Sequence, residues 1–134
     1  MPATDRAIEL CRRAALAASQ RKAEEIIAID VSDRLALTDV FLIASGANDR
    51  QVRAIVDVVD EAMLKAGAKR RMREGLTEAR WVLLDYGDVV VHIQRSEDRD
   101  FYALERLWKD CPAIEIPGLD DMTALDVPDS VEGA

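Results

Sequence analysis

Residues 81–94, WVLLDYGDVVVHIQ, decide the fold, because two short aliphatic and β-branched runs flank a polar, glycine-containing break. This pattern predicts a β-hairpin. A loop of two or four residues pairs Leu84 with Val89 and Trp81 with His92, whereas a three-residue loop breaks this pairing. Because side chains alternate between the faces of a strand, one face is predicted to be wholly apolar and to pack against helices. It consists of Val82, Leu84, Val89, Val91 and Ile93.

The opposite face of the hairpin carries Trp81, Leu83, Asp85, Asp88, Val90, His92 and Gln94. An aromatic and two aliphatic side chains edged by polar groups are typical of a protein-binding surface, with Trp81 as its anchor. An ordinary half-buried tryptophan would explain Trp81 about equally well, and the polar neighbours favour the interface. We therefore predict a partner-binding site formed by Trp81, Leu83, Asp85 and His92, with Tyr102 and Glu105 of the last helix at its rim.

The composition indicates a single domain, since 134 residues suffice for one ordinary core. We expect residues 1–110 to form the domain and residues 111–134 to form an acidic, flexible tail. The net charge of −8 resides mainly in that tail, because seven acids and no Lys or Arg follow Lys109. A body near −1, from 18 basic and 19 acidic residues, argues against nucleic-acid binding as the main function.

The sequence also predicts a cytoplasmic protein without a membrane span. No run approaches the ~20 apolar residues that cross a bilayer, and the first helical segment is too charged for a signal peptide. Cys11 and Cys111 lack the spacing of metal ligands and suit a reducing compartment, although a single disulfide stays open. No cofactor and no metal are expected.

Hydrophobic periodicity and capping residues predict eight elements in the order α-β-β-α-β-β-β-α. This order is typical of an α/β domain with a mixed β-sheet and helices mainly on one face. The expected elements are a helix over 4–20, strands over 24–31 and 39–45, a helix from Asn48 to about Ala66, a short extended basic segment over 69–73, the hairpin, and a helix over about 99–109 capped by Asp98 or Asp100.

Each candidate chemical site has a plainer interpretation. The turn at 44–46 before a helix could bind phosphate, but it lacks the glycine-rich patterns, and an ordinary turn is favoured about four to one. Asp85 and Asp88 flank a turn and do not form the Asp-x-Asp pair that places two carboxylates on one strand face, so turn capping is favoured. His92, the only histidine, has no sequence partner for a triad. The basic run 69–73 indicates a charge-protected edge, with ribosomal RNA contact as a minority alternative.

Several segments, taken together and in order, resemble the ribosomal silencing factor family, also called Iojap, over about residues 5–109. Gln94 stands where an aromatic commonly follows the family's Val-His-x unit, and Asn48 replaces a small hydroxyl residue at a helix start. The matching segments are Lys22–Ile26, Asp39–Phe41, Ala44–Gly46, Arg50–Val52, Glu74-Gly75, Trp81–His92, Arg99–Tyr102 and Leu104–Trp108.

The resemblance implies a fold like that of nucleotidyltransferases without their catalytic motif. It also implies a non-enzymatic translational repressor that binds the large ribosomal subunit through a ribosomal protein on its joining face. The bound repressor would sterically block the small subunit, especially when nutrients are short. Members are often homodimers. Two alternatives remain open: an assembly adaptor of the large subunit, and a divergent metal-dependent nucleotidyltransferase that uses Asp39, Asp85 or Asp88.

Overall fold

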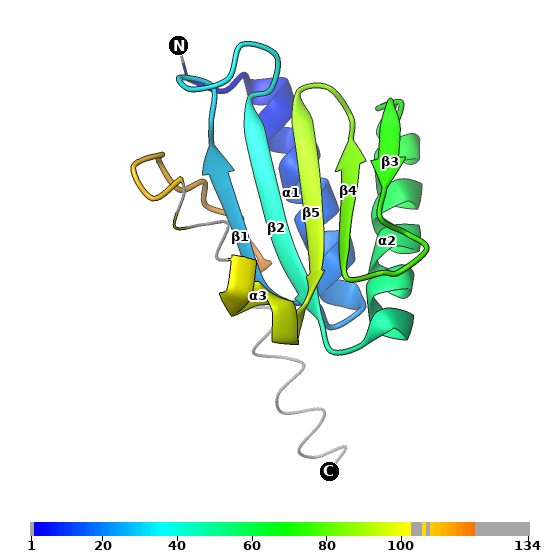
Figure 1. The fold of residues 1–134 in the computed structure, drawn as a ribbon. Coiled ribbons are helices and arrows are strands. Elements are labelled where there is room, and N and C mark those ends of the chain that lie inside the picture. The colour runs from blue at the N-terminus through cyan, green and yellow to red at the C-terminus, as the bar shows by residue number, and fades with distance from the viewer. Residues whose placement is uncertain (1, 103–105, 107, 120–134) are drawn as a thin grey trace.

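The computed structural model describes residues 2–102, 106 and 108–119, and places a five-stranded sheet in the order β1-β2-β5-β4-β3 within them. Helices α1 and α2 lie behind this sheet and α3 lies at the lower end of its front (Figure 1). This arrangement confirms the predicted α/β fold with helices mainly on one face. The elements are α1 (Asp5–Gln20), β1 (Glu24–Asp30), β2 (Val40–Gly46), α2 (Asp49–Lys65), β3 (Met72–Glu74), β4 (Trp81–Asp85), β5 (Val89–Arg95) and α3 (Ser96–Tyr102).

The sheet is mixed, because β2 and β5 run parallel while the other neighbouring strands are antiparallel. β5 occupies the centre, and its residues from Val89 to Gln94 are all buried. The apolar face predicted for the hairpin is confirmed. Its five members are fully buried in the core that the sheet shares with α1 and α2: Val82, Leu84, Val89, Val91 and Ile93.

Both long helices begin where their capping residues predict. Thr4 Oγ1 accepts a hydrogen bond from Ala7 N at 3.1 Å, and Asn48 Oδ1 accepts one from Gln51 N at 2.9 Å. These side chains satisfy amide groups that a helix N-terminus leaves free. The side chains that α2 buries recur at the three- and four-residue spacing from which a helix is predicted: Val52, Ile55, Val56, Val59 and Met63.

The predicted hairpin pairing was wrong by two residues. In the structure Leu84 pairs with Val91 and Trp81 with Gln94. The loop contains only Gly87 and Asp88, because Tyr86 N donates to Val89 O at 2.9 Å and so extends the pairing. Tyr86, which the sequence placed in the turn, is buried in the core on the helix side. Since the shift is an even number of residues, every side chain keeps its predicted face.

The last helix also begins earlier than predicted. It starts at Ser96, whose Oγ donates to Glu24 Oε1 at 2.9 Å and to Gly46 O at 3.2 Å. Asp98 therefore lies inside the first turn, where its carboxylate accepts from Arg80 Nη1 and caps no helix. Residues 103–105 and 107 of the predicted helix lie outside the described part of the chain.

Residues 112–116 lie along the free edge of β1. Asp30 N donates to Pro112 O at 2.8 Å, and Ile114 N donates to Ala28 O at 2.9 Å. Ile114 and Ile116 are half-buried against the helix-side core. The division of the chain at residue 110 stays a prediction, and residues 120–134 lie outside the described part.

Both cysteines are free thiols, with Cys11 buried and Cys111 half-buried. A disulfide between them, which the sequence left open, is therefore not formed in this structure. Within the described ranges, no helix is both long and apolar enough to cross a membrane.

We expect Gly75→Ala to destabilise the domain far more than Gly67→Ala. Both glycines have positive φ angles, +87° and +83°, which cost an L-residue about 1–2 kcal/mol. A Cβ on Gly75 would also lie 2.1 Å from Trp81 O, whereas one on Gly67 would meet only Arg6 Nη2 at 3.7 Å. Urea denaturation of both variants measures the difference, and equal losses would contradict the close packing of residue 75 against β4.

Candidate functional site

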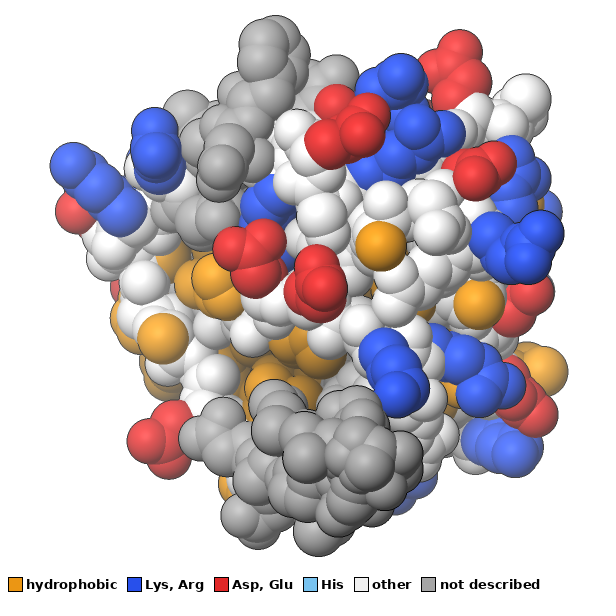
Figure 2. All heavy atoms as spheres, turned by 90° about the horizontal axis from the view of Figure 1, so that it is seen from below, with side chains coloured by type: hydrophobic (Ala, Val, Ile, Leu, Met, Phe, Trp, Pro, Cys, Tyr) orange, Lys and Arg blue, Asp and Glu red, His pale blue; other side chains and the backbone are white. Residues whose placement is uncertain are grey.

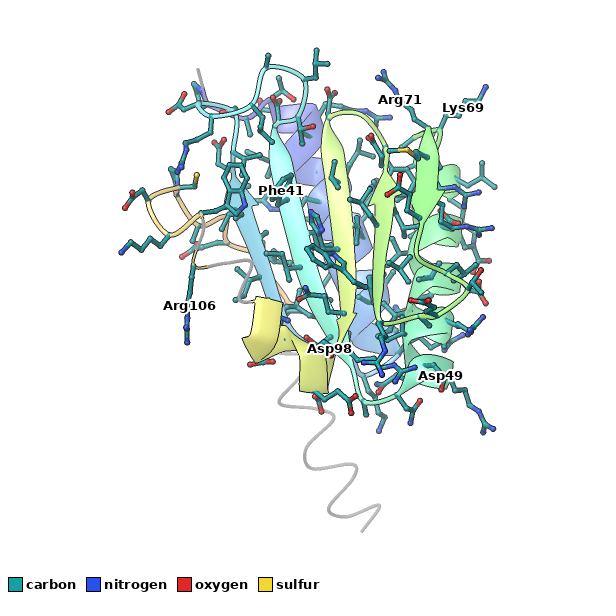
Figure 3. All side chains as sticks on the ribbon, viewed as in Figure 1. Phe41, Asp49, Lys69, Arg71, Asp98 and Arg106 are labelled. Atoms are coloured by element: carbon teal, nitrogen blue, oxygen red, sulfur yellow. The ribbon has the colours of Figure 1, made fainter. Side chains whose placement is uncertain are left out.

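The front of the sheet carries a cluster of aromatic side chains. We call Phe41, Trp81, His92 and Trp108, together with Leu83 and Val90, the aromatic face. Phe41 projects from the middle of this face (Figure 3). Its ring lies 4.7 Å from the His92 ring and 5.0 Å from the Trp108 ring, in edge-to-face geometry in both cases. Such contacts favour one fixed arrangement of the rings.

Trp81 and His92 form a hydrogen-bonded pair within this face. Trp81 Nε1 donates to His92 Nδ1 at 3.1 Å, so the neutral imidazole carries its proton on Nε2. Burial lowers the pKa of His92 to about 4. The imidazole is therefore uncharged near neutral pH. It orients the indole of Trp81, as expected for a hydrogen-bonded sheet residue.

The structure places four of the predicted contact residues on one face. Trp81, Leu83 and Asp85 follow one another at alternate positions of β4 and are each half-buried, while His92 is buried beside them. Tyr102 lies in α3, but its side chain is outside the described structure, as is the whole of Glu105. Contact of these residues with a partner stays a prediction.

Two aromatic members of the face, Phe41 and Trp108, were missing from the sequence-based site. Phe41 pairs with Val90 across the parallel β2–β5 contact, which places it next to His92. Trp108 returns to the sheet after α3, and the Arg34 guanidinium lies 5.2 Å from its ring centroid. The alternation of Phe41, Ile43 and Ser45 was visible in the sequence. Only the order of the strands shows that it continues the aromatic face.

Toward α3 the same side of the sheet becomes polar. Gln94 is completely buried, and its side-chain amide has no hydrogen-bond partner among the described residues; the same is true of His92 Nε2. Arg99 is also buried, and its guanidinium donates to Ser45 Oγ and to Glu25 O. A buried polar group costs stability unless it is hydrogen-bonded. This end of the face therefore combines a hydrogen-bonded arginine with an amide and an imidazole nitrogen whose hydrogen bonds are unmade among the described residues.

Two of the three aspartates proposed for catalysis have structural partners. Asp85 Oδ1 accepts from Gly87 N at 2.7 Å and so caps the hairpin turn, as the sequence predicted. Asp39 Oδ2 accepts from Thr4 N at 3.0 Å, which fastens the N-terminal segment. Asp88 is exposed in the loop. Across the described part of the chain, no group of three or more His, Cys, Asp or Glu side chains is placed to hold a metal ion.

The turn from β2 into α2 is held by hydrogen bonds within the chain, made by the side chain of Gln51. Gln51 Oε1 accepts from Ala47 N at 2.6 Å, and Gln51 Nε2 donates to the carbonyl oxygens of Arg21 and Lys22. This is the geometry of an ordinary strand-to-helix turn. The fold and the aromatic face together therefore define an α/β domain with a candidate protein-binding face.

Comparison with known proteins identifies the family of this domain. The family model described as ribosomal silencing factor during starvation matches residues 4–132, and the chain belongs to this family. The match extends beyond the region of about 5–109 in which the sequence resemblance was recognised.

Individual relatives agree with this assignment. A ribosomal silencing factor of Bacillus subtilis is 41% identical over 103 residues, covering 77% of this chain and 87% of that protein. A crystal structure from Chromobacterium violaceum, 36% identical, has a TM-score of 0.73 and covers 75% of this chain and 84% of the other. A mouse protein named mitochondrial assembly of ribosomal large subunit protein 1 is 33% identical over 92 residues, covering 66% of this chain and 40% of that protein.

The buried imidazole should make stability depend on pH. Because the pKa of His92 is about 4 in the folded chain and 6.5 when unfolded, the unfolded state binds more protons between these values. His92 should therefore reduce stability as the pH falls from 6.5 toward 4, by about 2 kcal/mol between pH 7 and pH 5.

Denaturation at both pH values measures this loss, and His92→Gln is the control in which this contribution is absent. Since the chain has a single histidine, its ring NMR signals report the same pKa directly. A titration near pH 6.5 in the folded protein would contradict the burial.

Proposed function

We propose that the chain restrains translation by binding the large ribosomal subunit through a ribosomal protein on its joining face. The bound domain would block the small subunit by occupying its place, especially under nutrient limitation. The family match over residues 4–132, whose description names silencing during starvation, is the observation that carries this proposal. No bond is made or broken in this mechanism, so the protein acts without catalysis. The bacterial silencing factors among its relatives support action in the cytoplasm.

The aromatic face is the proposed contact with the ribosomal protein. Trp81 and Leu83 are half-exposed and offer a large apolar contact at its centre. The hydrogen bond to His92 holds the indole in one orientation, which reduces the entropy lost on binding. Asp85 has a second carboxylate oxygen for a Lys or Arg of a basic ribosomal protein. Tyr102 and Glu105 complete the proposed rim.

A role in assembly of the large subunit is the second candidate, and the name of the mouse relative favours it. An adaptor would bind the same surface without preventing the subunits from joining. Sedimentation of mixed subunits separates the two functions, because only a repressor reduces the amount of joined ribosomes. Sedimentation of the purified protein would test the homodimer in the same series.

The third candidate is a divergent nucleotidyltransferase. It requires Mg²⁺-dependent nucleotide binding that is lost on Asp85→Ala. Asp85 holds Gly87 N in the hairpin turn, so this variant needs a melting curve as a folding control.

Trp81→Ala should weaken binding to the large subunit by about 2 kcal/mol or more, the range of interface hot spots. The variant should also raise the amount of joined ribosomes relative to the wild-type protein. Asp85→Asn should cost less and mainly reduce the salt dependence of binding. Quantitative pull-down of large subunits and sedimentation of mixed subunits give the two measurements.

Leu64→Ala is the matched control, because Leu64 is 74% exposed and lies on α2, behind the sheet. It should bind as well as the wild-type protein. Denaturant melts of all three variants identify a purely structural effect, since loss of a core tryptophan costs roughly 3–5 kcal/mol of stability. A Trp81→Ala protein that is folded and binds at full strength would rule out this face.

A further inference from the structure

A second charged surface lies at the edge of the sheet formed by β3. This strand pairs only with β4 among the described residues, and its three residues are exposed. Besides Arg70, which is paired with Asp60, four exposed basic side chains border it: Arg53 of α2, and Lys69, Arg71 and Arg73. We call these four the basic edge. Figure 3 shows Lys69 and Arg71 pointing outward from the upper corner of the sheet. Seen from below, Lys and Arg side chains also gather on the side of the molecule where α2 lies (Figure 2).

The basic edge contains a hollow between two guanidinium groups. Arg73 pairs with Leu84, so its side chain faces the same side of the sheet as α2. Arg53 reaches across from α2, and its Nη2 donates to Thr77 O at 2.7 Å. Together with Gly75 and Leu76, these residues line a hollow of about 340 Å³. Two arginines from different elements therefore meet at one open site.

Arg71 extends the basic edge to the hairpin turn. Its guanidinium packs against Gly87, where a Cβ would lie 3.1 Å from Arg71 Cζ. Its backbone is fixed by the hydrogen bond from Arg71 N to Asp85 O at 2.7 Å. The basic groups therefore follow one line from the turn to the hollow.

Some of the acidic side chains near this line are already paired or face the other side. The Asp60 carboxylate accepts from Tyr86 Oη and is paired with Arg70, and Glu61 pairs with Lys65 at 3.5 Å. Glu74 pairs with Leu83 in register and so projects toward the aromatic face. Three exposed acids stand close to this line: Asp57 one turn beyond Arg53, Glu78 next to Thr77, and Asp88 in the hairpin turn. No ion pair within 4.0 Å involves Arg53, Lys69, Arg71 or Arg73 in the described part of the chain.

Protection of a strand edge alone explains these residues poorly. One or two lysines suffice to discourage edge pairing, and β3 has only three residues. Edge protection gives no reason for Arg53, which belongs to a helix, to share a hollow with Arg73. Guanidinium forks match phosphate oxygens in geometry, and such contacts fix the position of a protein on a nucleic acid.

We propose that the basic edge binds backbone phosphates of ribosomal RNA next to the ribosomal protein that the aromatic face contacts. The proposal deepens the proposed function and rests on it for the identity of the RNA. The two surfaces are neighbours, because β3 pairs with the strand that carries Trp81, Leu83 and Asp85. Simultaneous contact would fix the orientation of the domain and raise its effective affinity. Since the chain as a whole carries −8, a local group of basic side chains would favour the approach of RNA at this edge.

The test uses the full chain and a fluorescein-labelled hairpin RNA of large-subunit sequence, with anisotropy measured over a salt series. The wild-type protein should bind at low salt, with a slope of log K against log salt of about −2 to −3.5 for three or four phosphates. Lys69→Gln/Arg71→Gln/Arg73→Gln should bind at least about tenfold more weakly and should lose most of that slope. Arg73→Lys keeps the charge and should retain the slope.

The control is Arg13→Gln/Arg21→Gln/Lys109→Gln, which removes the same charge at exposed positions away from β3. It should bind RNA within about twofold of the wild-type protein. Absence of RNA binding by the wild-type protein, or equal weakening in both triple variants, overturns the proposal. So does competition by poly-glutamate at the concentration at which RNA competes, since that would identify an acidic protein as the partner.

Two further measurements separate this proposal from the proposed function. Trp81→Ala should bind the hairpin RNA normally, because the tryptophan lies on the aromatic face. The basic-edge triple variant should retain binding to the isolated ribosomal protein partner, but its affinity for whole subunits should fall and should lose salt dependence. If Trp81→Ala bound large subunits at full strength, the proposed function would fail and the RNA site would still stand. If the basic-edge triple variant bound RNA as the wild-type protein does, the RNA site would fail and the proposed function would still stand. Melting curves of both triple variants verify that they are folded.

Discussion

The parallel pairing of β2 with β5 is the contact on which the rest of the structure depends. It is continuous from Val40 opposite Val89 to Gly46 opposite Arg95. Parallel neighbours cannot be joined by a tight turn, so the chain between them must cross over, and α2 provides that crossover. The same register sets Phe41 beside His92 and brings Ser45 to Arg99. A slip by one residue would move the side chains of one strand to the opposite face of the sheet, and would disrupt the helix-side core together with the aromatic face.

Local patterns were sufficient to predict most elements of the fold. The stripe of α2, the caps at Thr4 and Asn48 and the alternation of the hairpin are all properties of near neighbours in the sequence. The register of the hairpin was not, because Tyr86 looks like a turn residue between Asp85 and Gly87. Its ring is buried and its hydroxyl donates to Asp60 of α2, so a contact with a distant helix keeps it in the paired part of the hairpin.

The candidate site also contains residues that local patterns predict and residues that they do not. Trp81, Leu83, Asp85 and His92 share a face because of strand alternation, which can be seen in the sequence. Phe41 and Trp108 join them only through the order of the strands and the path of the chain after α3, and neither is encoded locally. The predicted pairing already set Trp81 opposite His92, whereas the structure places Trp81 opposite Gln94 and forms its hydrogen bond to His92 diagonally across the two strands.

Because residues 112–116 cover the β1 edge of the sheet, its two edges differ in what borders them. The β3 edge is left open and charged, whereas the β1 edge is closed by residues made more than eighty positions later, through Ile114 N and Ala28 O. The second side of β2 is likewise paired only by β5, which is synthesised later. During synthesis β1 and β2 can pair with each other, but the other side of each strand must leave the exit tunnel without its partner. Folding should be dominated by non-local contacts, slow for a chain of this size, and dependent on release of the C-terminal segment.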